Sequence, residues 1–140
     1  MVTRPTKRPT AASAFHLEIE GISAASFVSC SGLGGRVSVL ELVEGGSADP
    51  RKFRGDSSCQ NILLERGVLR DRELFDWYAR GDRRDGSIVL LSSAGVEVCR
   101  WSFVRGWPCR WEGPTLDARS PEVALEMVEI AHEGLQCLVR

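Results

Sequence analysis

The chain has 140 residues, of which 43% are hydrophobic and 26% are charged, and its formal net charge is -1. This length suits a single domain, and this composition argues against a largely disordered chain. The near-neutral charge lacks the basic excess of a typical nucleic-acid-binding protein, and no apolar run approaches the ~20 residues of a membrane span. The basic N-terminus has no apolar run behind it, so we expect no secretory signal.

The first part of the chain predicts a tail and then strands. Residues 1–13 carry Pro, Thr, Arg and Lys without periodicity, which indicates a flexible basic N-terminal tail, and residues 14–140 are expected to form one domain. Apolar and polar residues alternate over 15–20, as in a half-buried strand. Residues 25–31 predict a weaker strand, and the Gly-rich segment 31–35 predicts a turn or bulge.

The next segment is apolar on both of its faces. Arg36–Glu44 carries Val and Leu at odd and even positions alike, so we expect a strand covered on both faces, with a neighbouring subunit as one candidate cover. Gly45–Ser58 is polar and predicts a long loop, and loops beyond ~12 residues tend to be functional or disordered. Gln60–Arg66 predicts a further strand.

One helix is predicted, over Asp71–Arg80. Asp71 is suited to cap its N-terminus, and Glu73 suits the positive end of the helix dipole in the first turn. Gly81 is placed to end the helix. The apolar stripe that we expect to pack on a sheet consists of Leu74, Trp77 and Tyr78.

Two strands and an ambiguous segment follow the helix. Ser87–Leu91 predicts a buried strand, and from Glu97 onward apolar side chains fall on the odd positions 99, 101, 103, 107, 109 and 111. A period of two over this length indicates an extended ribbon, with Trp101 and Phe103 expected to pack on the helix stripe. Pro121–His132 fits either a helix, which its Glu-rich composition favours, or a strand with a β-bulge.

The sequence carries no catalytic, cofactor-binding or metal-binding motif. The five Cys form no C-x-x-C pair, and Cys30, Cys99 and Cys109 stand in apolar contexts where a free thiol packs as a small hydrophobe. An enzyme with a Cys nucleophile would need His16 or His132 beside a cysteine, and the spacing does not favour this alternative. We therefore expect a protein that is not an enzyme and binds no cofactor.

Several segments follow one another in the order of a known family. They are Phe15-x-Leu17-x-Ile19-x-Gly21 and residues 27–33, 41–46, 51–55, 62–67, 100–103, 107–114 and 131–135. Together they cover about residues 15–136. With them the chain resembles the tail tube protein family of contractile phages and phage-tail-like contractile injection systems, which is related to the hemolysin-coregulated protein of type VI secretion.

The resemblance implies a fold and a function. The fold would be mainly β, a small antiparallel β-barrel or sandwich with one flanking α-helix, in which residues 122–132 form a closing strand. The chain would be a structural subunit whose hexameric rings stack into a hollow inner tube. The alternative within the same family is a tube initiator or a tube–baseplate adaptor.

The resemblance also implies partners. These are further copies of the chain, the sheath, the baseplate and the tube terminator, with cargo or DNA only as a passenger in the channel and no membrane anchor. Assembly is expected in the cytoplasm, into a phage tail or a phage-tail-like particle. The acidic residues of 112–133 are expected to face either the channel or a basic neighbouring surface, for which the candidates are residues 51–54 and the group Arg80, Arg83 and Arg84. We expect the polar loop to make the contact between rings. Its contact residues would be Glu44, Gly45, Gly46, Arg51, Lys52, Phe53 and Arg54.

Overall fold

The structure is a computed structural model that describes residues 10–11, 14–22, 27–46 and 48–139. The tail predicted over residues 1–13 therefore lies outside the described residues, apart from positions 10 and 11. The longest described stretch, 48–139, contains the segment predicted to be helical.

The described residues form nine strands and one helix. In chain order these are β1 (Phe15–Ile19), β2 (Phe27–Ser31), β3 (Gly35–Leu42), β4 (Arg51–Cys59), β5 (Ile62–Gly67), α1 (Glu73–Arg80), β6 (Arg84–Leu91), β7 (Glu97–Glu112), β8 (Leu125–Ala131) and β9 (Leu135–Val139). The chain is mainly β, as predicted. The described helix has eight residues and is too short to cross a membrane.

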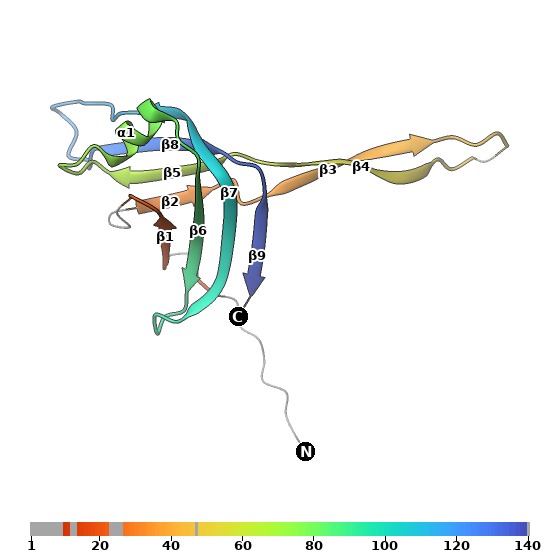
Figure 1. The fold of residues 1–140 in the computed structure, drawn as a ribbon, viewed down its shortest axis with the longest axis horizontal. Helices are drawn as coiled ribbons and strands as arrows, with labels where there is room; N and C mark the ends of the chain where they lie inside the picture. The colour runs from red at the N-terminus through yellow and green to blue at the C-terminus, as the bar shows by residue number, and fades with distance from the viewer. Residues whose placement is uncertain (1–9, 12–13, 23–26, 47, 140) are drawn as a thin grey trace, which may run out of the picture.

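The strands form one bent antiparallel sheet and one separate hairpin (Figure 1). The order in the larger sheet is β1-β6-β7-β8-β5-β2, and β9 pairs with β7 as well. The 16-residue β7 joins the two halves of this sheet, because it pairs with β6 and β9 near its start and with β8 near its end. In the described chain the end strands β1 and β2 do not pair with each other, so the predicted barrel is not closed.

The hydrophobic core lies within the bend of the sheet and includes one side of α1. Its buried residues come from six elements: Leu17, Ile19, Ile62, Leu64, Leu74, Trp77, Ile88, Phe103, Val128 and Ile130. The predicted alternation of β1 is confirmed, since Leu17 and Ile19 are buried and Glu18 between them is exposed. The segment predicted as ambiguous is a strand, β8, as the family resemblance implied.

The helix matches its prediction except at two positions. Leu74 and Trp77 are buried, but Tyr78 is 42% exposed and does not belong to the packed stripe. The N-cap residue is Arg72 and not the predicted Asp71, which lies one residue before it. From there the Asp71 carboxylate still accepts a hydrogen bond from the Glu73 backbone N–H, at 3.2 Å. Gly81 ends the helix in the left-handed conformation, with φ at 68°.

A fully buried arginine joins three strands of the body and the segment before α1. Arg66 of β5 donates from Nε to Glu126 of β8 at 2.7 Å and from one terminal nitrogen to Asp71 before α1 at 2.8 Å. Its guanidinium also lies over the ring of Phe27 in β2, 5.7 Å from the centroid. Burial alone would lower the pKa of Arg66, but the bonds to Glu126 and Asp71 outweigh burial and raise it.

Glu126 explains why β8 is hard to recognise in the sequence. It is a charged residue on the inward face of the strand, the same face as Val128 and Ile130. Both of its carboxylate oxygens accept hydrogen bonds, one from Arg66 and the other from the Trp111 indole N–H at 3.2 Å. The inward positions therefore read as acid, Val, Ile instead of three apolar residues. The pairing of β8 with β5 continues in register, so the bulge suggested by the sequence is absent from that ladder.

The aromatic ribbon keeps its predicted phase only in its first half. Phe103 is buried, but Trp101 is only half-buried and lines an apolar groove of about 320 Å³ with Phe15, Val28, Ser29, Cys30, Leu33, Ile88 and Leu90. Arg105 has a positive φ of 52°, and the β7–β8 register shifts again between Pro108 and Arg110. Each irregularity turns the strand, so the prediction that Cys109 is packed is wrong, and this residue is exposed.

We predict that Arg66→Met lowers the free energy of unfolding by about 3–5 kcal/mol, because it leaves the carboxylate of Glu126 buried without its cation. Adding Glu126→Gln should recover part of this loss, since Gln carries no charge and still accepts from Trp111. Urea unfolding measures both variants. The control is Arg119→Met, which removes an exposed pair with Asp117 and should leave the midpoint unchanged. An Arg66→Met variant as stable as the parent would contradict this role.

Candidate functional site

The most prominent surface feature is a two-stranded arm that projects from the body (Figure 1). Strands β3 and β4 pair with each other, from Gly35 opposite Cys59 to Leu42 opposite Arg51, and form a sheet separate from the body. The prediction of a long loop over Gly45–Ser58 is therefore wrong, because the second half of that segment is β4. Neither face of β4 packs on the body, so its sequence shows none of the apolar alternation that reveals a half-buried strand.

The arm continues the pair of strands that forms one end of the body sheet. β2 pairs with β5, and the chain passes from β2 into β3 and from β4 into β5. Gly32 lies at this junction with φ at 87°, and a Cβ there would collide with the backbone carbonyl oxygen of Asn61. The junction therefore requires glycine, both for its backbone conformation and for the close approach of the two strands.

A bulge divides the arm along its length. Val37 is opposite Ser57 and Val39 is opposite Arg54, so Gly55 and the residue after it face Ser38 alone. A Cβ at Gly55 would collide with the Ser38 hydroxyl, and it would also lie 3.0 Å from the Ser38 carbonyl oxygen. Bulges of this kind bend a strand and increase its twist, which sets the direction of the outer part of the arm.

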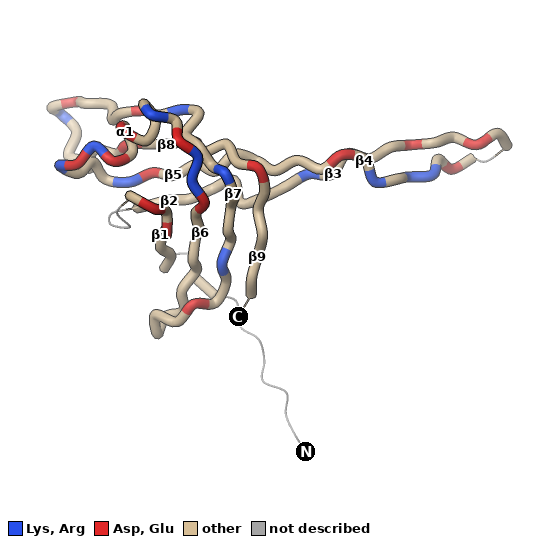
Figure 2. The backbone as a smooth tube through the Cα atoms, in the orientation of Figure 1, with Lys and Arg blue, Asp and Glu red and all other residues tan. Residues whose placement is uncertain are grey.

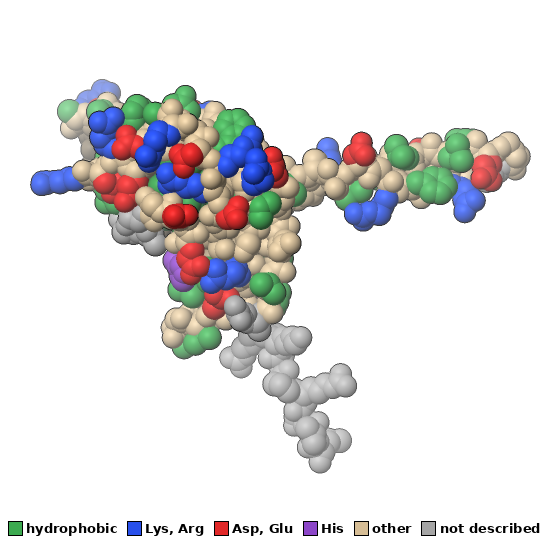
Figure 3. Space-filling model, viewed as in Figure 1, with side chains coloured by type: hydrophobic (Ala, Val, Ile, Leu, Met, Phe, Trp, Pro, Cys, Tyr) green, Lys and Arg blue, Asp and Glu red, His purple; other side chains and the backbone are tan. Residues whose placement is uncertain are grey.

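Apolar side chains are exposed along the arm (Figure 3). Leu40 lies opposite Phe53 on one face, and these side chains are 57% and 46% exposed. Leu42 follows on the same face, while Val39 lies on the other. An isolated two-stranded hairpin is at best marginally stable in water, and an exposed apolar surface commonly marks a protein contact. The arm therefore has the properties of a segment that is stabilised by another molecule.

The predicted contact residues all lie on the arm, but not on one loop. Glu44, Gly45 and Gly46 belong to the tip, while Arg51, Lys52, Phe53 and Arg54 are the first four residues of β4. Figure 2 shows the cations of β4 grouped along one edge of the arm. Arg51 lies 3.5 Å from the Glu44 carboxylate, and both members of this ion pair are largely exposed. The Arg51 guanidinium also lies 5.8 Å from the centroid of the Phe53 ring.

The acidic residues expected to meet this arm are mostly engaged within their own chain. Glu112 and Glu129 both pair with Arg110, at 2.7 and 3.1 Å, and Glu133 pairs with Arg105 at 2.6 Å. A hydrogen bond from Asn61, followed by those from Arg110 and Cys109, holds the pKa of Glu129 below its usual value. Together with Asp117 and Glu126, these acids already have cationic partners, so the structure gives little support to an acidic surface reserved for the arm.

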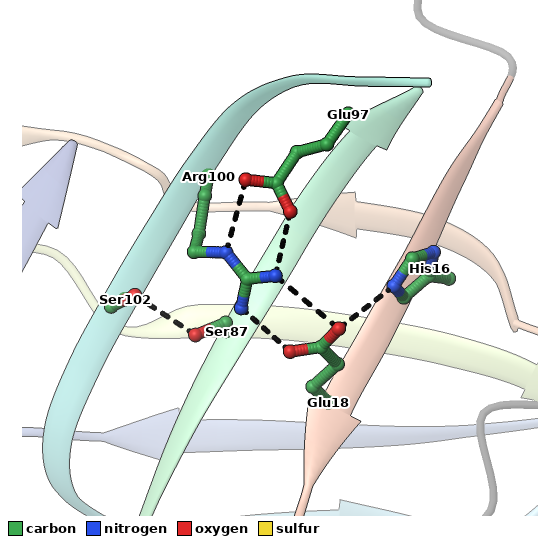
Figure 4. Close-up of polar contacts among 6 residues, drawn as sticks. All are labelled: His16, Glu18, Ser87, Glu97, Arg100 and Ser102. Atoms are coloured by element: carbon green, nitrogen blue, oxygen red, sulfur yellow. Dashed lines mark hydrogen bonds and ion pairs between the residues drawn. The ribbon is translucent and has the colours of Figure 1, made fainter. Parts of the chain in front are cut away.

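In a second polar surface, on β1, β6 and β7, the charged and polar side chains also pair with one another (Figure 4). Arg100 binds Glu97 and Glu18, each with a shortest distance of 2.6 Å, and Glu18 also accepts from His16 at 3.1 Å. The hydrogen bonds that Arg100 donates to Glu97 and then to Glu18 raise the pKa of Arg100, and the bond from Arg100 lowers the pKa of Glu18. Ser87 and Ser102 bond to each other across the strands at 2.8 Å.

The two histidines do not assemble a nucleophilic site with a cysteine. His132 accepts from the Gly134 N–H at 3.2 Å through Nδ1 and contacts the Gln60 carbonyl oxygen at 2.9 Å through Nε2, so both ring nitrogens are used by backbone groups. His16 is bonded to Glu18. Within the described residues, no group of three or more His, Cys, Asp or Glu side chains is arranged to hold a metal ion.

Comparison with known families decides the classification. The family model described as T4-like virus tail tube protein gp19 matches residues 11–136. The chain belongs to this tail tube family. A search of the curated proteins found no match. The resemblance drawn from the sequence segments is thus confirmed.

Solved structures agree with this tail tube classification. A chain from the sheath–tube complex of an extracellular contractile injection system, PVC, in its extended state is 25% identical, with 94% of this chain and 93% of that chain covered and a TM-score of 0.86. A chain from the tube-terminating cap of the anti-feeding prophage is 21% identical, with 99% and 97% covered and a TM-score of 0.90. Hcp1 from Flavobacterium johnsoniae is 15% identical, with 88% and 93% covered and a TM-score of 0.63. The last two show that the fold is shared.

We predict that, in the free subunit, backbone amides of β3 and β4 exchange with deuterium roughly a hundredfold or more faster than those of β5 and β8. The reason is that the body strands share a core, whereas the arm has only its own cross-strand pairs. Hydrogen exchange read out by mass spectrometry measures the difference, with the Phe103 region of β7 as the protected reference. Equal protection of arm and body would mean that the arm is stable by itself.

Proposed function

We propose that this tail tube protein is the subunit of a hollow inner tube, in which hexameric rings of identical chains stack along one axis. The tube would serve a contractile phage tail or a phage-tail-like injection system. Rings arise when each subunit contacts the next by a head-to-tail interface that closes, and stacked rings give an open filament. Membership of the tail tube family and the likeness to a sheath–tube complex support this function.

The observation that carries the proposal in this chain is the exposed apolar arm. Leu40 and Phe53 form a cross-strand pair whose side chains are about half exposed in the subunit. Full burial of such a side chain is worth about 1.5–3 kcal/mol relative to leaving it in water, and each of these two side chains can still gain about half of this. The arm can gain this energy by packing on a neighbouring ring, and the gain recurs at each subunit.

The arm would then be the contact between rings, and other surfaces would meet the sheath, the baseplate and the tube terminator. Cargo or DNA would pass through the channel without being a ligand of the chain. This role requires no catalytic group, and we propose that the protein is not an enzyme. Assembly would take place in the cytoplasm.

The second candidate is a tube initiator or tube–baseplate adaptor of the same family. It is favoured by the likeness to chains from a tube-terminating cap and from a baseplate, the latter 23% identical with a TM-score of 0.84. Negative-stain electron microscopy of the purified chain separates the two candidates. Long hollow tubes support a main tube subunit, whereas single rings that never stack support the initiator or adaptor.

We predict that Leu40→Thr combined with Phe53→Thr raises the protein concentration needed for tube formation by about tenfold or more. Full burial of such a side chain is worth roughly 1.5–3 kcal/mol, and because Leu40 and Phe53 are only about half exposed in the subunit, each substitution removes about half of this; 1.4 kcal/mol corresponds to a factor of ten. Threonine keeps the strand propensity of the arm, so thermal unfolding of the body should be unchanged. Sedimentation of assembled material measures the effect.

The matched control for this pair is Leu116→Thr with Val123→Thr, two apolar residues outside the arm that are 81% and 76% exposed. The control variant should assemble like the parent. If the arm variant assembles as readily as this control, the arm does not make the contact between rings.

A separate prediction concerns the charge of β4. Reversing Arg51, Lys52 and Arg54 to Glu should weaken ring stacking and leave single rings intact, because exposed cations contribute modestly to a contact that is repeated at every subunit. The control reverses the exposed Arg70, Arg72 and Arg119 to Glu, which changes the net charge equally. Equal loss of stacking in both triple variants would show a general charge effect and no specific role for β4.

A further inference from the structure

Two cysteines on neighbouring strands lie within contact distance of each other. The sulfur atoms of Cys99 in β7 and Cys137 in β9 are 3.4 Å apart. In the strand register, Cys137 is opposite Trp101 and Cys99 is opposite Val139. The two cysteines are therefore diagonal neighbours on the same face of the sheet, since side chains two residues apart along a strand point to the same side. Both are free thiols in the structure.

The two thiols differ in their access to solvent. Cys99 is only 8% exposed, and burial, with a smaller contribution from Cys137, raises its pKa. Cys137 is exposed at the edge of the sheet. A dissolved oxidant therefore reaches Cys137 first, and Cys99 is the buried thiol that stands beside it. A disulfide requires the two sulfurs to close from 3.4 Å to about 2.0 Å, which is a small displacement.

We propose that Cys99 and Cys137 are a modification site, at which a small-molecule disulfide such as oxidised glutathione converts the two thiols into a reversible disulfide that ties β9 to β7. The thiolate of Cys137 attacks one sulfur of the oxidant, which releases one glutathione thiolate and leaves a mixed disulfide. The thiolate of Cys99 then attacks the Cys137 sulfur and releases the second glutathione. Two protein thiols are oxidised, one glutathione disulfide is reduced to two thiols, and the two protons pass to the released glutathiones.

The link has a structural consequence because β9 is held by few contacts. It has five residues, pairs with β7 over residues 99–103, and is mostly exposed. A short, exposed edge strand opens more readily than the centre of a sheet. The disulfide would close the chain segment 99–137 into a covalent loop and so restrict the open state of β9.

Two of the other cysteines are less suited than Cys137 to the first step, the attack on the dissolved oxidant. Cys30 lines the apolar groove, and burial raises its pKa to about 11, so little of it is thiolate near neutral pH. Cys109 donates from its thiol to the Glu129 carboxylate at 3.4 Å, and burial followed by this bond raises its pKa. Cys59 is exposed at the base of the arm and serves as the control position.

The test uses the full chain, reduced and then incubated with oxidised glutathione. After acid quenching and unfolding, free thiols are alkylated and counted by intact mass, and peptide mapping locates the linked residues. We expect three of the five cysteines to be alkylated, a linked Cys99–Cys137 peptide pair, and recovery of five after reduction. Hydrogen exchange over residues 135–139 should become several-fold slower in the oxidised form.

Two single variants make the result specific. Cys137→Ser changes an exposed residue and should fold normally, but no internal disulfide should form in it on oxidation. In Cys59→Ser the disulfide should still form, so the number of alkylatable thiols should still fall by two. The proposal is overturned if five thiols remain alkylatable in the parent, if glutathione stays attached to Cys137 without a second step, or if the only product is a dimer linked through Cys59.

Discussion

The buried guanidinium of Arg66 is the interaction on which the geometry of the molecule depends. It joins β5 to β8 through Glu126, reaches the start of α1 through Asp71, and lies over the Phe27 ring of β2. β2 and β5 are the two strands from which the arm grows. A cation inside the body thus fixes the base of an arm whose own residues have no core. The arrangement combines a rigid support with a projecting surface that needs a partner.

Much of the body is predictable from the sequence because its strands bury one face. The alternation at Phe15, Leu17 and Ile19 predicts β1, and Leu74, Trp77 and Gly81 predict the position and the end of α1. In these elements one face packs on the core and the other faces solvent, so the residue types alternate accordingly, and the structure confirms both predicted elements. For β8, the family order of the segments predicts a strand against the helical composition of the segment, and the structure confirms the strand.

The failures have physical causes that can be named. β4 is missed because both of its faces are exposed, so polar residues such as Ser57 carry no penalty there. β8 is hard to recognise because Glu126 places a charge on its inward face, and the compensating cation, Arg66, lies sixty positions away in the sequence. The phase of β7 is lost at Arg105, where a positive φ turns the strand. β9 escapes detection because five mostly exposed edge residues bear almost no pattern.

We propose above all that a neighbouring ring completes the arm. A cryo-electron microscopy reconstruction of the assembled chain measures this most directly, through the environment of Leu40 and Phe53 in the tube. We expect both side chains to be buried against a subunit of the next ring. A tube in which these two side chains remain in solvent, with the rings joined by other surfaces, would contradict this proposal.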